Sequence, residues 1–160
     1  MSAKSNLDMV RNSPLGRDLT GAQCEALAEI VEVRTLSKDE FLIREGEVDN
    51  KLYVSVSGEI LVTKNSGASE EQLHVLGPGS VAGAMGFIDG LEHSASLKAN
   101  STTEVFAIER TKFESLVNSN PMVAYQVMRT IVRDIHSIVK KMNTSHVEFS
   151  NYINRHHGRY

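Results

Sequence analysis

The spacing of apolar residues changes from a helical to a strand-like period early in the chain. Over residues 19–31 the apolar positions recur every three or four residues, which predicts a helix capped at its start by Thr20. From residue 33 to residue 108 apolar and polar positions alternate in short runs, and turn residues such as Gly58 and Gly79 separate the runs. Many short strands at close spacing are typical of an antiparallel β-roll or jelly roll.

A second, longer helix is predicted after these strands. Pro121 marks its start, because proline is well accommodated at the first helical position. Apolar residues then follow at alternating spacings of four and three, the heptad pattern of a coiled coil: Ala124, Met128, Ile131, Ile135, Ile138 and Met142. This heptad seam either covers the strands alone or also packs against a second copy of the chain, and its width favours a homodimer.

The predicted elements suit one domain in a chain of 160 residues. We expect a polar segment with a turn over residues 1–19, the domain over residues 20–142 with its last helix over 121–142, and a tail or helix extension over 143–160. No apolar run approaches the ~18 residues of a membrane span, and the single cysteine, Cys24, suits a reducing compartment. The sequence therefore predicts a cytoplasmic protein with Cys24 buried in the first helix.

The net charge of −3 is unevenly distributed. Residues 1–109 contain 9 Lys and Arg against 17 Asp and Glu, whereas residues 110–160 contain 8 against 3. A basic C-terminal third invites a nucleic-acid interpretation, but its charges fall on the polar side of the heptad helix, where a solvated flank explains them. Too few residues follow that helix for a helix-turn-helix domain. We therefore expect no direct DNA binding by this chain.

The sequence patterns of catalytic and metal sites are missing. The chain contains no nucleophile elbow, no Walker sequence and no paired carboxylates at a strand end. His74 and His93 lie on different predicted strands, and neither has a neighbour at the spacing of metal ligands. We interpret both as surface or pocket histidines, and we expect neither an enzyme nor a resident metal.

The segment of residues 76–99 is the richest in glycine, with five glycines from Gly77 to Gly90. Such density predicts tight turns, or backbone brought close to something bound. A single helical turn after Gly83 would offer free backbone N–H groups, which attract anions. In the alternative interpretation the glycines only serve turns, and the apolar residues between 85 and 88 fill the interior.

The same segment resembles the phosphate-binding cassette of cyclic-nucleotide-binding domains, the effector domains of regulators related to the catabolite activator protein. Gly83 matches a family glycine, and Ser94 matches the end of the motif. Ala84 stands where the family has a glutamate that takes the ribose hydroxyl, and His93 stands where it has the arginine that pairs with the cyclic phosphate. Residues 43–60 are also similar to a strand–turn–strand motif of that family.

The resemblance implies a mostly β fold, an antiparallel β-roll of the cyclic-nucleotide-binding type with flanking helices and a long C-terminal dimer helix. It implies cyclic AMP or cyclic GMP as the ligand. The implied ligand-binding residues are Gly83, Ala84, Met85, His93, Ser94 and Ala95.

Two functions stay open from the sequence. One is a non-catalytic sensor that binds a cyclic nucleotide weakly or atypically and signals through its dimer helix to a separate protein, because one imidazole lacks the paired donors of a guanidinium. The other is a ligand-free dimeric interaction scaffold with a degenerate pocket.

Overall fold

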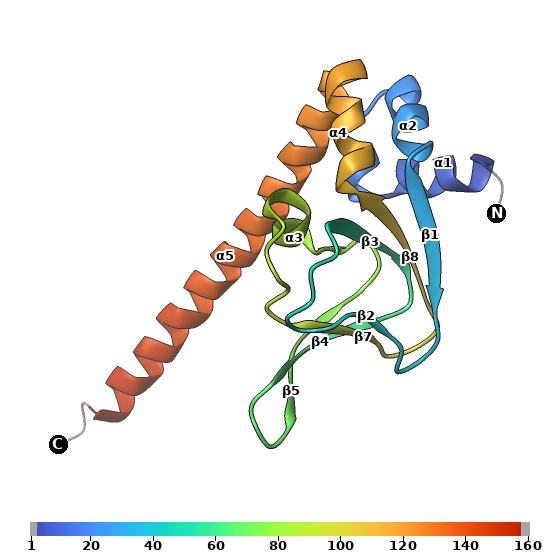
Figure 1. Cartoon of the computed structure of the whole chain (residues 1–160). Coiled ribbons are helices and arrows are strands. Elements are labelled where there is room, and N and C mark those ends of the chain that lie inside the picture. The colour runs from blue at the N-terminus through green and yellow to red at the C-terminus, as the bar shows by residue number, and fades with distance from the viewer. Residues whose placement is uncertain (1–2, 158–160) are drawn as a thin grey trace.

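The computed structural model describes residues 3–157 of the chain, and the side chains of residues 6–154. Two four-stranded antiparallel sheets form a roll, with helices gathered at one end and one long helix running past it (Figure 1). The first sheet has the order β1 (Val31–Leu36), β8 (Thr103–Glu109), β3 (Lys51–Ser57) and β6 (Val81–Ala82). The second has the order β2 (Phe41–Ile43), β7 (Ser96–Ala99), β4 (Ile60–Asn65) and β5 (Glu70–Leu76). The predicted antiparallel β-roll is confirmed.

Alternation along the strands creates two hydrophobic clusters. On β3, Leu52 and Val54 are fully buried in a cluster shared with the helices. Tyr53, between them, points to the opposite face and joins a second cluster that fills the roll between the two sheets. This division follows from the period of two in a strand, which sends neighbouring side chains to opposite faces.

The first predicted helix is shorter than its sequence pattern indicates. Helix α2 (Gly21–Ala28) is capped by Thr20. The Thr20 hydroxyl accepts a hydrogen bond from the Gln23 backbone N–H, and the Gln23 side-chain oxygen accepts one from the Thr20 backbone N–H, a capping box. Val31, predicted to end the helix, instead starts β1 and pairs with Ile108 of β8. Pairing with a distant strand therefore overrides the local helical period. Cys24 is 2% exposed in α2, as predicted.

The N-terminal segment contains a helix that the sequence pattern did not predict, followed by the predicted turn at Pro14 to Gly16. Helix α1 (Ala3–Asn12) leads into a short 3-10 helix, η1 (Pro14–Gly16). Val10 and Leu15 are completely buried in the cluster shared with α2 and the first sheet. Because most of α1 is polar and its large apolar residues are only Leu7, Met9 and Val10, the helix gave no extended periodic signal in the sequence.

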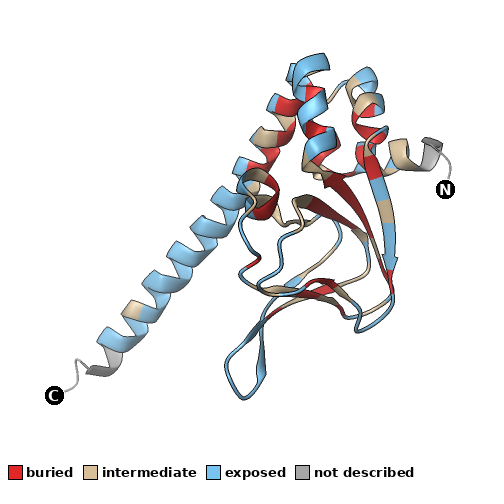
Figure 2. Ribbon diagram, in the orientation of Figure 1, coloured by how far each residue is buried: buried red, intermediate tan, exposed pale blue. Residues whose placement is uncertain are grey.

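Two helices follow the roll. Helix α4 (Arg110–Ser119) leads directly into α5 (Pro121–His157), which starts at the predicted proline. The helix extends beyond Met142 through the last described residues, so the extension, and not an irregular tail, follows the predicted helix. Only the beginning of α5 is buried, and from Val132 onward it is largely exposed (Figure 2). No helix in the described part of the chain has the length and apolar character that a membrane span requires.

Gly58 is the turn residue that joins β3 to β4, and its backbone has φ +84°. A Cβ atom added there would lie 2.5 Å from the Thr102 carbonyl oxygen and 2.7 Å from the Thr103 Cα. Gly67, in the turn between β4 and β5, has φ +86° but no atom within 4 Å of an added Cβ. Substitutions at the two glycines therefore distinguish the cost of a left-handed backbone from the cost of steric crowding.

We expect Gly67→Ala to lower the free energy of unfolding by about 1 kcal/mol, the cost of a left-handed backbone for alanine. Gly58→Ala carries the same backbone cost plus a backbone clash, so we expect a loss of about 3 kcal/mol or more. Urea unfolding followed by circular dichroism measures both variants. Equal losses would mean that the turn at Gly58 relaxes freely around a side chain.

Candidate functional site

The glycine-rich segment forms a short helix held in a loop, as predicted. Helix α3 (Ala84–Asp89) follows β6 and begins after Gly83, whose backbone has φ +80°. A Cβ at Gly83 would lie 2.8 Å from the Lys51 carbonyl oxygen, so only glycine fits there. At the other end Gly90 has φ +68° and donates its N–H to the Gly86 carbonyl. Glycine thus sets both ends of α3.

His93 lies beneath this helix and is 9% exposed. A Cβ added at Gly86 would lie 3.0 Å from Cε1 of the His93 ring, so the missing side chain at Gly86 admits the imidazole. The His93 backbone also joins the loop before β3: its N–H donates to the Glu47 carbonyl at 2.9 Å, and its carbonyl accepts from the Gly46 N–H at 2.8 Å. His93 therefore links α3 to that loop.

The carboxylate of Asp49 binds the His93 ring. The two groups lie 2.8 Å apart, between His93 Nε2 and Asp49 Oδ1. Because a carboxylate only accepts, Nε2 carries the proton and donates it. The Lys51 backbone N–H donates to the same oxygen at 3.3 Å, and the Tyr53 hydroxyl donates to Asp49 Oδ2 at 2.5 Å. Both carboxylate oxygens are therefore occupied within the chain.

Tyr53 is 5% exposed and keeps its proton. Burial raises the pKa of its hydroxyl far above the usual range, and the hydrogen bond to Asp49 raises it further. Tyr53 therefore remains a donor to Asp49 at any ordinary pH. We refer to Asp49, Tyr53 and His93 as the Asp49 cluster.

The structure brings some of the predicted ligand-binding residues together and not others. Gly83 and His93 are close, since a Cβ on Gly83 would lie 3.7 Å from the His93 ring. Ala84 is half-buried at the start of α3, whereas Met85 is 50% exposed. Ser94 and Ala95 follow His93 into β7; Ser94 is exposed, and its carbonyl accepts from Lys64 Nζ at 3.0 Å. Their ligand roles stay predictions.

Sequence reasoning missed Asp49 and Tyr53. Asp49 lies 44 positions before His93, among acidic residues that suggest a solvated turn. Tyr53 fits the alternation of its strand and therefore gave no separate signal. The only clue was that a buried histidine needs a hydrogen-bond acceptor, and this requirement does not identify the accepting residue.

Helix α3 is packed against the helices beside it. Phe87 is 2% exposed, and its ring meets that of Phe113 on α4 edge to face, with 5.2 Å between centroids. The same hydrophobic cluster includes Val127 and Ile131 of α5. Helix α3 and the beginning of the long helix therefore belong to one hydrophobic cluster.

The heptad seam of α5 is divided between buried and exposed residues. Ala124 and Ile131 are 7% and 1% exposed and pack inside the chain, so they are not available to a second copy. Met128 is half-buried against the same cluster. The later residues open to solvent, with exposed fractions of 37% at Ile135, 50% at Ile138 and 65% at Met142. The first part of the seam therefore packs within the chain, and pairing of the later part with a second copy stays a prediction.

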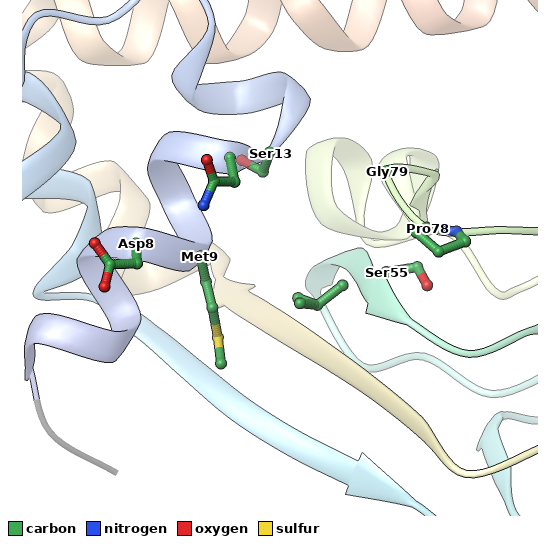
Figure 3. A pocket seen from close by; sticks show the side chains of 8 residues that line it. Asp8, Met9, Ser13, Ser55, Pro78 and Gly79 are labelled. Atoms are coloured by element: carbon green, nitrogen blue, oxygen red, sulfur yellow. The ribbon is translucent and has the colours of Figure 1, made fainter.

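Two surface cavities of about 350 Å³ each are lined by residues other than the Asp49 cluster. One lies between α1 and the roll (Figure 3), lined by Asp8, Met9, Asn12, Ser13, Ser55, Val56, Pro78 and Gly79. The other lies beside β2, β4 and β7, lined by Phe41, Arg44, Glu45, Thr63, Asn65, Glu70 and Ser96. Neither includes a predicted ligand-binding residue. In the part of the chain that the structure describes, no three His, Cys, Asp or Glu side chains are grouped to hold a metal ion.

Comparison with known proteins identifies the class. The family model for the cyclic nucleotide-binding domain matches residues 33–120, which includes the roll, α3 and the Asp49 cluster. This match extends over more than half of the chain. The chain therefore belongs to the cyclic nucleotide-binding domain family.

Individual relatives agree with this assignment. The cyclic AMP receptor protein of Thermus thermophilus is 28% identical, over 78% of this chain and 58% of that protein. The transcriptional activator protein Anr of Pseudomonas protegens is 34% identical, over 69% of this chain and 46% of that protein. A crystal structure of a cyclic nucleotide-binding domain from Methylobacillus flagellatus has a TM-score of 0.76 at 21% identity, covers 87% of this chain and 79% of that one, and shares its fold. The chain spans about half the length of the two curated relatives.

We expect Tyr53→Phe to lower the free energy of unfolding by about 1.5–3 kcal/mol, because it removes a buried hydrogen bond to a carboxylate. Tyr125→Phe is the matched control, since Tyr125 is 57% exposed on α5 and should change stability by less than about 0.5 kcal/mol. Chemical unfolding of both variants tests this difference. Similar values for the two would mean that Asp49 gains little from the Tyr53 hydroxyl.

Proposed function

We propose that this chain is a non-catalytic regulatory module that binds a cyclic nucleotide weakly or atypically at α3 and signals through a dimer of α5. The observation that supports it best is the hydrophobic cluster in which Phe87 of α3 packs with Val127 and Ile131 of α5. A ligand that moves α3 acts on α5 through this contact. The output is then a separate protein that responds to the position of the long helix.

Such signalling requires two arrangements of α3 and α5 that differ in ligand affinity. The packing of Phe87 supplies the connection, since a closely packed contact transmits displacement instead of absorbing it. The regulatory roles named for two relatives, a cyclic AMP receptor protein and a transcriptional activator, support the same class of function.

Weak binding follows from the side chains at the site. His93 offers one donor where a guanidinium offers a pair, and that donor already serves Asp49. Loss of a charge-assisted pair costs about 1.5–3 kcal/mol, which is about ten- to a hundredfold in affinity. Ala84 has no carboxylate for a ribose hydroxyl. The backbone N–H groups at the start of α3 remain as donors.

The exposed part of the seam supports a homodimer. Ile135, Ile138 and Met142 continue at heptad spacing beyond the body of the domain. Phe149 extends the same spacing and is 63% exposed. An apolar stripe of this kind on a long helix is buried when two copies pair.

A ligand-free dimeric scaffold is the second candidate, and the Asp49 cluster favours it. His93 has its acceptor within the chain, so the site is satisfied without a ligand. In that case α5 alone carries the function, and α3 serves packing.

Calorimetric titration with cyclic AMP and cyclic GMP separates the two candidates. We expect saturable binding with a Kd on the order of 10–100 μM, because backbone donors remain but the paired cation does not. If neither nucleotide gives a binding signal up to millimolar concentration, the scaffold remains as the function.

We expect Ile138→Glu to convert a dimer to a monomer, because it places a charge in the apolar seam. Ser137→Glu is the matched control: it adds the same charge at the neighbouring exposed position, outside the seam, and should leave the dimer intact. Sedimentation velocity measures both variants. A monomeric unmodified chain, or an unchanged dimer in Ile138→Glu, would contradict a dimer through this stripe.

A further inference from the structure

Two basic side chains near the start of β7, His93 and Lys64, already have carboxylate partners within the chain. His93 Nε2 lies 2.8 Å from Asp49 Oδ1. Lys64 Nζ, which donates to the Ser94 carbonyl, lies 3.6 Å from Glu45 Oε1. A phosphate that approached these two side chains would therefore meet donors that already have a carboxylate partner within the chain.

Asp49 is the more constrained of the two carboxylates. Its side chain is 26% exposed and receives three donors, from His93, Lys51 and Tyr53. Glu45 and Lys64 are more open, at 30% and 50%. The closer hydrogen bond and the buried ring make Asp49, and not Glu45, the carboxylate that decides what His93 can bind.

A phosphate on His93 would compete with Asp49 for the same proton donor. The Nε2 proton can serve one acceptor well, and a second anion beside Asp49 would face a like charge in a partly desolvated place. Nearby Glu47, which accepts from His93 through its carbonyl, adds to the negative charge of the loop. The arrangement disfavours anions more than neutral ligands.

We propose that Asp49 is the specificity-determining residue of this site, an internal carboxylate that occupies the His93 donor and so excludes ligand phosphate until it is displaced. This inference rests on the proposed function for the location of the ligand. Displacement also frees α3, because His93 is wedged against Gly86 and tied through its backbone to the loop at Glu47. The ligand then enters the site at the same time as α3 is released from the loop.

The test compares Asp49→Asn with Asp89→Asn in the full chain. Asparagine keeps the shape of Asp49 and removes its charge. Asp89, at the end of α3, is exposed, so its variant makes the same change in net charge outside the cluster. Asp49→Ser is a second neutral variant in case asparagine prevents folding, which circular dichroism checks.

Each protein is titrated calorimetrically with cyclic AMP and with adenosine, which has no phosphate. We expect Asp49→Asn to tighten cyclic AMP binding about tenfold or more, with adenosine changed less than about twofold, because only the phosphate competes with the carboxylate. Asp89→Asn should change neither by more than about twofold.

The outcomes separate this inference from the proposed function. If the unmodified chain binds cyclic AMP and the neutral variants bind it no more tightly, Asp49 does not set specificity, while the sensor function stands. If the unmodified chain does not bind cyclic AMP and a neutral variant does, Asp49 is the excluding group and the natural chain is a scaffold. If all folded variants are silent, both ideas are wrong. An equal gain for adenosine would also overturn the role in phosphate exclusion.

Discussion

The packing of α3 against α4, in a hydrophobic cluster that also includes residues of α5, is the interaction on which the other features depend. Phe87 meets Phe113 edge to face and is buried in the cluster that also holds Val127 and Ile131. It fixes a six-residue helix, too short to be stable alone, against a helix of 37 residues. The first part of the heptad seam is buried in this cluster, while the later part is open.

Shape and chemistry are separable at this site. Gly83 and Gly86 keep the backbone close to its neighbours, through a left-handed φ in one case and room for the His93 ring in the other. These constraints are steric, and they set the path of the backbone around α3. The side chains carry different chemistry, since the His93 ring is hydrogen-bonded to Asp49 within the chain. Membership of the cyclic nucleotide-binding domain family therefore accounts for the fold, while the ligand is decided by a few polar groups.

Helix α5 combines two roles along one stripe. Its first turns contribute Val123 and Val127 to the core, and its later turns present Ile138 and Met142 to solvent. A heptad pattern read alone cannot distinguish these surfaces, because the same spacing serves a domain interior and a partner helix. The boundary falls where the helix passes beyond the body of the roll (Figure 2).

The sequence by itself determined the features that depend on spacing over a few residues. They include the alternation of the strands, the Thr20 cap, the start at Pro121 and the short helix after Gly83. Only the tertiary structure decided features that depend on distant partners. Val31 joins a strand because Ile108 lies opposite it, and Asp49 meets His93 because β3 passes beneath α3. The local spacing of apolar residues determines which faces of a helix or strand are apolar. The approach of other helices and strands determines what each face contacts.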